Sequence, residues 1–407
     1  MKLSRHHPEW FITGLGAVLI ASQTLVPQPS AISPVPSPRF CFACEDLAAI
    51  DILLNILLFI PLGIGLRLSG HSRKNGVAIA AMLSGIVELL QLSVVIGRDS
   101  SVRDFLMNTL GALIGVLLAG GWRRLAFPSH AEARRLRLLG AACWLLLSVG
   151  EAALLGRAFL PTSWYGQWAP DGVFPATFSG HVLAVRVDSL DLSGERLPNS
   201  DRVRAALLQD HWTLTVKATT GEPTPDRSSV FSIFDGEQRE MLVVGQQGTD
   251  LFARYRTHAA KMGLRSPSIV LPGAFALPRG EPIRISMSFD RGVISLTTVA
   301  STKTVSREVS VTPSWGWSLL LPFEAPIGPL ARLWCGLWTA ALLFPTGYWT
   351  GRRIGTFKAV AFGGLLLFLG MGLTPLLFQL PPARLEEWTA GAAGLVTGWW
   401  LGREGRR

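Results

Sequence analysis

Three pairs of polar residues lie inside apolar stretches of this sequence. The pairs are Asp51 with Asn55, Glu88 with Gln91, and Asp104 with Asn108. Side chains three or four positions apart share one face of a helix. Ionisable groups within a membrane span are costly and are therefore candidates for a functional site. The spacing predicts that these six side chains form an outward-facing polar pocket between three neighbouring helices.

The loop before the last pair adds two guanidinium groups, because Arg98 and Arg103 flank the start of its helix. Carboxylates and a guanidinium can neutralise one another where either alone would be expensive. The same groups could instead form a polar lock that fixes helix packing without chemistry. For Asp51 and Asn55, capping of a helix N-terminus is a further alternative.

The elements that must position these residues are membrane helices. Only 16% of the 407 residues are charged, and the mean hydropathy is +0.35. Eight apolar stretches approach the length of roughly 20 residues that a helix needs to span a bilayer. They cover residues 10–27, 48–68, 77–96, 104–122, 138–160, 328–349, 357–379 and 387–402. The first stretch could also be a cleaved signal peptide.

The distribution of charge predicts the orientation and excludes a nucleic-acid partner. Residues 161–325 contain 16 Lys/Arg and 16 Asp/Glu, so the net charge of +10 lies among the apolar segments. One set of short loops and termini holds sixteen Lys/Arg and the opposite set holds four. Cytoplasmic loops accumulate Lys and Arg. We therefore expect a multi-pass protein of the bacterial inner membrane with both termini cytoplasmic and residues 161–325 extracytoplasmic.

Residues 161–325 show the alternation typical of strands. In 211–217 and 282–290, apolar and polar residues alternate with period two. Further strands are expected at 181–187, 229–234, 240–246, 250–257, 293–298, 304–311 and 316–321. No helical pattern competes convincingly. About nine short strands with turn signals predict an all-β antiparallel sandwich.

The remaining chemical signals are few. Cys41 and Cys44 lie in the first outer loop, where a small disulfide is favoured over a redox motif or a metal site. Glu151 lies in the fifth apolar stretch, where pairing with another helix is favoured over a proton relay. Neither H-E-x-x-H nor G-x-S-x-G occurs, and no His falls within a predicted span. We expect no cofactor and no metal.

The polar segments together resemble the VanZ-like membrane protein family over residues 45–120. The resemblance rests on 51–63 (DILLNILLFIPLG), 88–91 (ELLQ), Arg98 and 104–115 (DFLMNTLGALIG). It implies a membrane protein of the cell envelope, linked to tolerance of glycopeptide antibiotics. The strand pattern of 161–325 is similar to laminin-G and concanavalin A-like jelly rolls, which implies carbohydrate binding but transfers no ligand residues.

A weaker pattern near the C-terminus repeats the spacing of the fourth stretch. Its residues are Glu387, Gly391, Gly394 and Gly398, which match Asp104, Asn108, Gly111 and Gly115. Glycine-rich spans produce such patterns by chance, so coincidence and an ancient duplication both remain open.

The predicted architecture is a polytopic α-helical membrane protein of about eight spans with an inserted jelly-roll sandwich. Its domains are a five-span VanZ-like bundle at 1–160, the sandwich at 161–325 and a three-span region at 326–407. The leading hypothesis is that the pocket binds an envelope-derived ligand and the sandwich a cell-wall glycan. The alternatives are an integral-membrane enzyme acting on lipid-linked cell-wall precursors and a scaffold that recruits envelope proteins. The ligand, the occurrence of catalysis and the oligomeric state stay open.

Overall fold

The computed structural model describes residues 8–27, 48–95, 100–157, 161–172, 174–192, 196–197, 200–321, 326–327 and 330–404. The chain divides into two compact units. Unit 1 comprises Met1–Ala133 with Met262–Leu264, and unit 2 comprises Arg134–Lys261 with Arg265–Arg407. Each unit is described by itself.

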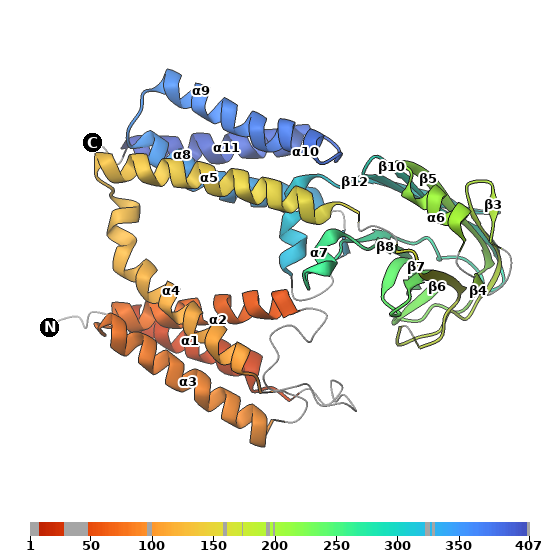
Figure 1. The fold of residues 1–407 in the computed structure, drawn as a ribbon, viewed down its shortest axis with the longest axis horizontal. Helices are drawn as coiled ribbons and strands as arrows, with labels where there is room; N and C mark the ends of the chain where they lie inside the picture. Colours follow the sequence, from red (N-terminus) through yellow and green to blue (C-terminus); the bar gives the residue numbers. More distant parts are fainter. Residues whose placement is uncertain are drawn as a thin grey trace. The chain divides into compact units, whose positions relative to one another are not determined.

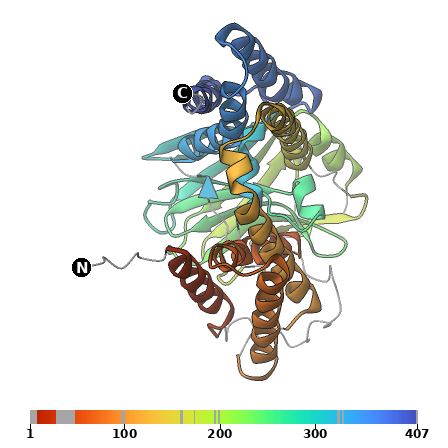
Figure 2. The same cartoon turned by 90° about the vertical axis from the view of Figure 1, so that its left-hand side faces the viewer.

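Unit 1 is a bundle of four apolar helices (Figures 1 and 2). They are α1 (Pro8–Thr24), α2 (Ala48–Leu68), α3 (Arg73–Ser93) and α4 (Val102–Ala126). Ser72 caps α3, because its side chain accepts a hydrogen bond from the Asn75 N–H at 3.1 Å. The fully buried Phe59 and Ala112 belong to the hydrophobic core between these helices.

Glycines bring α2 and α4 into direct backbone contact. A Cβ atom at Gly111 would collide with the carbonyl oxygen of Ile56, and one at Gly63 would collide with that of Ala112. Only residues without a side chain permit such an approach. The Asp104 and Asn108 face of α4 is therefore held tightly against the start of α2.

Unit 2 contains the second group of helices. They are α5 (His130–Leu155), α8 (Ala331–Gly351), α9 (Thr356–Leu367), η3 (Phe368–Leu373), α10 (Thr374–Leu377) and α11 (Leu385–Glu404), and the first residues of α5 belong to unit 1. The η3 segment is a π-helix that joins α9 to α10 within one continuous rod. The sheets lie beyond the end of α5 (Figure 1).

The helix packing of unit 1 recurs in unit 2. Gly347 of α8 abuts the carbonyl oxygen of Leu395 in α11, as Gly63 of α2 abuts that of Ala112 in α4. The sequence match of α4 with α11 is thus accompanied by the same pattern of close contacts. The prolines also correspond. Pro345 lies two residues before Gly347 in α8, and Pro61 lies two residues before Gly63 in α2.

Five described helices are long and apolar enough to cross a membrane. They contain residues 49–68, 73–93, 102–126, 130–155 and 356–377. The chain therefore has the helices of a membrane protein. Helices also form at the other three predicted spans, but the eight-span count is not confirmed.

Two open sheets form between α5 and α8. The seven-stranded sheet has the order β13-β9-β8-β7-β6-β1-β4, and the six-stranded sheet has the order β12-β11-β10-β5-β2-β3. All pairings are antiparallel except that of β13 with β9. The strands are β1 (Trp164–Trp168), β2 (His181–Val187), β3 (Leu190–Asp191), β4 (Arg196–Leu197), β5 (His211–Thr219), β6 (Arg227–Asp235), β7 (Glu240–Gln247), β8 (Asp250–Tyr255), β9 (Ser268–Leu271), β10 (Pro282–Asp290), β11 (Val293–Ala300), β12 (Thr304–Ser310) and β13 (Pro326–Ile327).

Aromatic side chains join the buried faces of the two sheets. Phe289 of β10 stacks on Trp212 of β5 in the same sheet. It also contacts Tyr255 of β8 in the other sheet edge to face, with the ring centroids 6.0 Å apart. Such offset and edge-to-face pairs add to the hydrophobic stabilisation of a core. The two-sheet expectation is met, whereas the jelly-roll topology is not confirmed because the sheets are open.

The strand predicted at 316–321 is wrong. Residues Pro313–Leu320 instead form the 3₁₀-helix η2, with Pro313 in its first turn. Two short helices also interrupt the strands, α6 (Asp201–Leu208) and α7 (His258–Lys261). The longer helix, α6, begins after Ser200, whose side chain accepts a hydrogen bond from the Val203 N–H. It buries Val203 and Leu207 on one face.

Candidate functional site

Arg103 connects the acidic ends of α2 and α4 in unit 1. Its Nε lies 3.2 Å from Asp104 Oδ1, and one terminal nitrogen lies 3.9 Å from Asp51 Oδ2. The Arg103 side chain is 5% exposed, whereas those of Asp51 and Asp104 are 40% and 22% exposed. A planar guanidinium suits two carboxylates, because it presents several donors in fixed directions.

Two further predicted residues join this end of the bundle through α3. Glu88 is buried, and its Oε2 accepts a hydrogen bond from the Ser101 backbone N–H at 2.8 Å. Asn108 is also buried, and its Nδ2 donates to Ser84 Oγ at 3.0 Å. Among the described residues, the Asn108 Oδ1 atom has no hydrogen-bond partner. A buried amide oxygen is costly to leave unpaired, so this atom is a candidate contact for a water or a ligand.

The remaining described site residues, Gln91 and Asn55, lie on α3 and α2, respectively. Gln91 Nε2 donates to the Thr24 carbonyl oxygen at 3.0 Å and so ties α3 to the end of α1. Asn55 lies one turn beyond Asp51 on α2 and is half-buried. Arg98, Cys41 and Cys44 lie outside the described residues, so the guanidinium at the mouth and the disulfide stay predictions.

We call Asp51, Glu88, Arg103, Asp104 and Asn108 the unit 1 polar cluster. The sequence grouped four of these residues by helical spacing. Arg103 was expected at the mouth beside Arg98, but it is buried between two carboxylates. Ser84 was missed, although it precedes Glu88 by one helical turn on the same face and could have been found by that spacing.

The charges of the unit 1 polar cluster indicate which groups it could bind. Among the described residues of the cluster, Arg103 pairs with the carboxylates of Asp51 and Asp104, and Glu88 adds a third carboxyl group, so hydrogen-bond acceptors outnumber the guanidinium. Such a site complements a ligand that carries amines, amides or hydroxyls rather than an anion alone. Among the described residues, no group of three or more His, Cys, Asp or Glu could hold a metal ion.

Unit 2 has its own buried carboxylates, but segments of the same chain satisfy them. Glu387, in the first turn of α11, accepts hydrogen bonds from the Thr312 and Ser314 hydroxyls at 2.7 and 2.6 Å. Glu151 of α5 accepts one from Trp338 Nε1 at 2.9 Å, which confirms its expected pairing with another helix. These groups fasten α5 to α8 and α11 to the start of η2.

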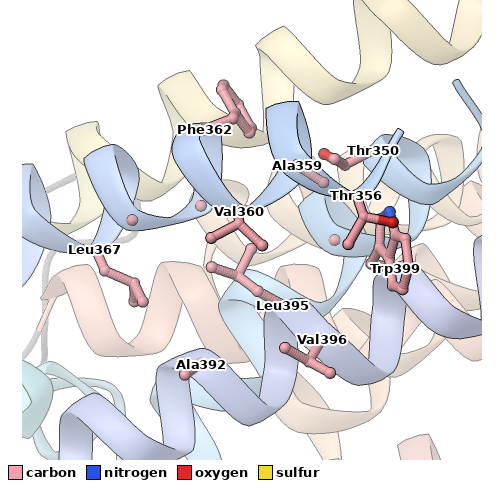
Figure 3. A pocket seen from close by; sticks show the side chains of 13 residues that line it. Thr350, Thr356, Ala359, Val360, Phe362, Leu367, Ala392, Leu395, Val396 and Trp399 are labelled. Carbon is pink, nitrogen blue, oxygen red and sulfur yellow. The ribbon is translucent and has the colours of Figure 1, made fainter. Parts of the chain in front are cut away.

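A groove of about 410 Å³ also lies between α8, α9 and α11 (Figure 3). Val360 and Leu367 of α9 face Leu395 and Val396 of α11, and most of the lining is aliphatic or aromatic. Among its described lining residues, the polar side chains are two threonines and the indole of Trp399. This groove offers hydrocarbon contact and no acid–base chemistry.

Comparisons with known proteins support part of the sequence reading. No curated protein and no solved structure matched the chain. A family match covers the four helices of unit 1 and, with them, the described residues of the polar cluster. Residues 12–123 match the model of the VanZ/LLP1 family, so this segment is similar to the VanZ-like domain.

Proposed function

We propose that this protein acts in the bacterial inner membrane and binds an envelope-derived ligand at the unit 1 polar cluster. In this proposal the termini are cytoplasmic, the sandwich is extracytoplasmic, and the protein contributes to tolerance of glycopeptide antibiotics. The observation that carries the proposal is the position of Arg103 between Asp51 and Asp104, beside the buried Glu88 and Asn108. A VanZ-like match over the same helices supports it.

The excess of acceptors favours a ligand with amine, amide or hydroxyl donors. Carboxylates bind such donors through charge-assisted hydrogen bonds, which are roughly twice as strong as neutral ones. The unpaired oxygen of Asn108 would accept one more. Peptide and sugar portions of envelope precursors carry these groups.

A glycan role for the sandwich is supported by one face of the six-stranded sheet. Hydroxyl side chains lie in cross-strand register there, with Ser286 opposite both Thr215 and Thr297. Ser288 continues the pattern opposite Thr213 and Ser295. These hydroxyls are half-buried and can donate as well as accept hydrogen bonds. Such a surface complements a polyhydroxylated ligand.

Substitutions in cells test the role of the unit 1 polar cluster. We expect Asp104→Asn and Glu88→Gln to increase sensitivity to glycopeptides at unchanged membrane abundance, because each replaces a carboxyl group with an amide. Glu132→Gln, which alters a carboxylate near the start of α5, should leave sensitivity unchanged. Unchanged sensitivity in stable Asp104 and Glu88 variants would remove the support for a ligand site.

A glycan array probed with the full chain in lipid nanodiscs tests the sandwich. Ser286→Leu should abolish any binding that the hydroxyl face provides, whereas Ser301→Leu in the β11–β12 turn should retain it. Turnover of a labelled polyprenyl-phosphate precursor by the same preparation would favour the enzyme alternative.

A further inference from the structure

A cavity of about 1220 Å³ lies in unit 2, where helices meet the sandwich. Its walls are the end of α5, the turn between β10 and β11, and the segment that follows α10. Leu376 and Phe378 bring apolar surface to it, while Asp210, His211 and Arg291 bring polar groups. Ligand pockets for drug-sized molecules occupy about 300–1,000 Å³. This cavity is larger, and its lining combines apolar and charged residues, as an amphiphile combines acyl chains with a charged head group.

Arg291 has an unusual backbone conformation for its residue type. The two-residue turn between the paired Asp290 and Val293 has φ values of 44° at Arg291 and 81° at Gly292. Positive φ at both positions is typical of a type I′ turn, in which Asn-Gly is strongly preferred. An arginine at the first position is strained, and such strain gathers at functional sites.

The two arginines of the cavity differ in their contacts. Arg157 donates to the Leu207 and Gln209 carbonyl oxygens at 2.9 and 3.1 Å, and its guanidinium lies 4.1 Å from the Phe289 ring centroid. These contacts fasten α5 to the sandwich. The Arg291 side chain is exposed and has no ion pair among the described residues. Its donors therefore remain available to a ligand.

Two aspartates, Asp210 and Asp290, lie beside Arg291. Its backbone N–H donates to the Asp210 carbonyl oxygen at 3.0 Å, and the preceding Asp290 contacts His211 Nδ1 at 2.8 Å. Burial, with Lys261 nearby, lowers the pKa of His258, so this lining residue is neutral near pH 7. Two arginines thus balance two aspartates around the cavity, which disfavours a purely anionic or purely cationic ligand.

We propose that this cavity binds a zwitterionic phospholipid with a phosphoethanolamine head group. The phosphate contacts Arg291, because a guanidinium binds phosphate oxygens in a bidentate manner. The primary ammonium contacts the carboxylates of Asp210 and Asp290. The acyl chains leave along Leu376 and Phe378, at the end of a helix long enough to span the membrane. This site is independent of the unit 1 polar cluster.

Native mass spectrometry of the full chain can test the proposal. Purified protein is titrated with phosphatidylethanolamine, phosphatidylcholine or phosphatidylglycerol in mixed micelles. We expect phosphatidylethanolamine to bind at least tenfold more tightly than the other two, since choline lacks ammonium hydrogens and glycerol lacks the cation. The water-soluble glycerophosphoethanolamine should bind at least tenfold more weakly, because it lacks the acyl chains.

Arg291→Asn is the decisive variant, because asparagine suits the turn but lacks the guanidinium. It should keep or raise the melting temperature while phosphatidylethanolamine affinity falls at least tenfold. Arg284→Asn, at an exposed position of β10, the strand that precedes this turn, should leave affinity unchanged. Equal binding of all three lipids, equal binding of the soluble head group, or full affinity in Arg291→Asn would overturn the proposal.

Discussion

At the scale of single residues, Arg103 determines whether the acidic groups of unit 1 can lie together. Its guanidinium is 5% exposed and pairs with two carboxylates on different helices. Removing one partner of a buried ion pair typically costs 3–5 kcal/mol, because the remaining charge is left uncompensated. The carboxylates here are partly exposed, so water screens them and reduces this cost.

We therefore expect Arg103→Met to destabilise the protein by about 1–3 kcal/mol. Methionine keeps much of the buried chain length but removes the charge, so the loss reports on the ion pairs. Thermal unfolding of the full chain in detergent, followed by tryptophan fluorescence, measures it. Arg124→Met is the control, because the Arg124 side chain is 84% exposed and its contact with Glu132 is 3.9 Å long. Equal effects of both substitutions would mean that Arg103 does not hold the cluster together.

Asp235, the last residue of β6, provides a pH-dependent contribution to the stability of the sandwich. Burial alone raises its pKa, but hydrogen bonds outweigh this effect and hold the pKa below its ordinary value of 3.8. The donors are the Arg239 side chain and the backbone N–H groups of Arg239 and Glu237, at 2.7–3.0 Å. A depressed pKa in the folded state stabilises the fold at every pH above the unfolded pKa.

Asp235→Asn should accordingly lower stability at pH 7 by about 1.5–3 kcal/mol, since it loses hydrogen bonds to a charged group. The difference from the unaltered protein should persist down to pH 4 and shrink below pH 3.8, because the unfolded carboxylate binds a proton there while the folded one is still ionised. Unfolding temperatures recorded from pH 7 to pH 2 test this. A difference that stays constant to the most acidic pH would exclude the ionised carboxylate as its source.

At the scale of elements, glycine contacts explain how two apolar helices acquire one defined register. Membrane helices gain little from hydrophobic burial against each other, so close packing of small residues decides how they associate. In unit 1, Gly111 and Gly115 of α4 abut the carbonyl oxygens of Ile56 and Ile60. This register brings Asp51 beside Arg103, and both residues precede the glycine contacts on their helices.

Gly111→Ala should therefore cost about 2–3 kcal/mol, because the added methyl meets backbone that cannot move aside. Gly121→Ala on the same helix is the matched control, since nothing lies within 4 Å of its Cβ position. That change should be neutral or stabilising by up to about 1 kcal/mol through helix propensity. Melting temperatures of the two variants give the comparison, and indistinguishable values would show that α2 and α4 do not depend on this contact.

Local patterns predicted most of the elements, because alternation or continuous apolarity marks them directly. The strand at Pro282–Asp290 has the expected alternating burial, and five of the eight predicted spans form helices long and apolar enough to cross a membrane. The strand expected at 316–321 failed because distant contacts fix η2. Its cap residue Thr312 and its second residue, Ser314, donate hydrogen bonds to Glu387, which lies more than 70 residues away. No local pattern encodes such a contact.

For the candidate site, the sequence predicted which residues share a helix face but not which residues pair between helices. Helical spacing grouped Glu88 with Gln91 and Asp104 with Asn108, because neighbours on one helix face are fixed by geometry alone. The pairing of Arg103 with Asp51 joins two helices across space, so spacing could not reveal it. Ser84 was overlooked because a serine inside an apolar helix often bonds to its own backbone, whereas here Asn108 donates to it.

At the scale of the whole molecule, the repeated helix packing supports an internal duplication. Helices α2 and α4 correspond to α8 and α11, and their glycines approach matching carbonyl oxygens. The caps of α3 and α9, Ser72 and Gly355, occupy corresponding positions in the two series. The sandwich interrupts the second series between α5 and α8. Hydroxyls at the start of η2 donate to Glu387, the counterpart of Asp104, whereas Asp104 itself pairs with Arg103 in the first copy.

This arrangement makes a prediction about membrane topology. In each unit the Lys and Arg residues gather at one helix end, and in unit 2 the sandwich follows the opposite end of α5. Because cytoplasmic loops accumulate Lys and Arg, the sandwich should face the extracytoplasmic side. Lys217, on a strand of the sandwich, and Lys358, at the start of α9, are both exposed and would lie on opposite sides of the membrane.

Cysteine labelling in a background without the four native cysteines can test this topology. In intact spheroplasts, a membrane-impermeant maleimide should modify Lys217→Cys fully and Lys358→Cys by less than a tenth as much. After permeabilisation, both positions should react equally, which controls for the accessibility of each thiol. Labelling of Lys358→Cys before permeabilisation would place the basic helix ends outside and the sandwich in the cytoplasm. Neither a cell-wall glycan nor an outer-leaflet ligand could then reach its proposed site, because the membrane would separate them.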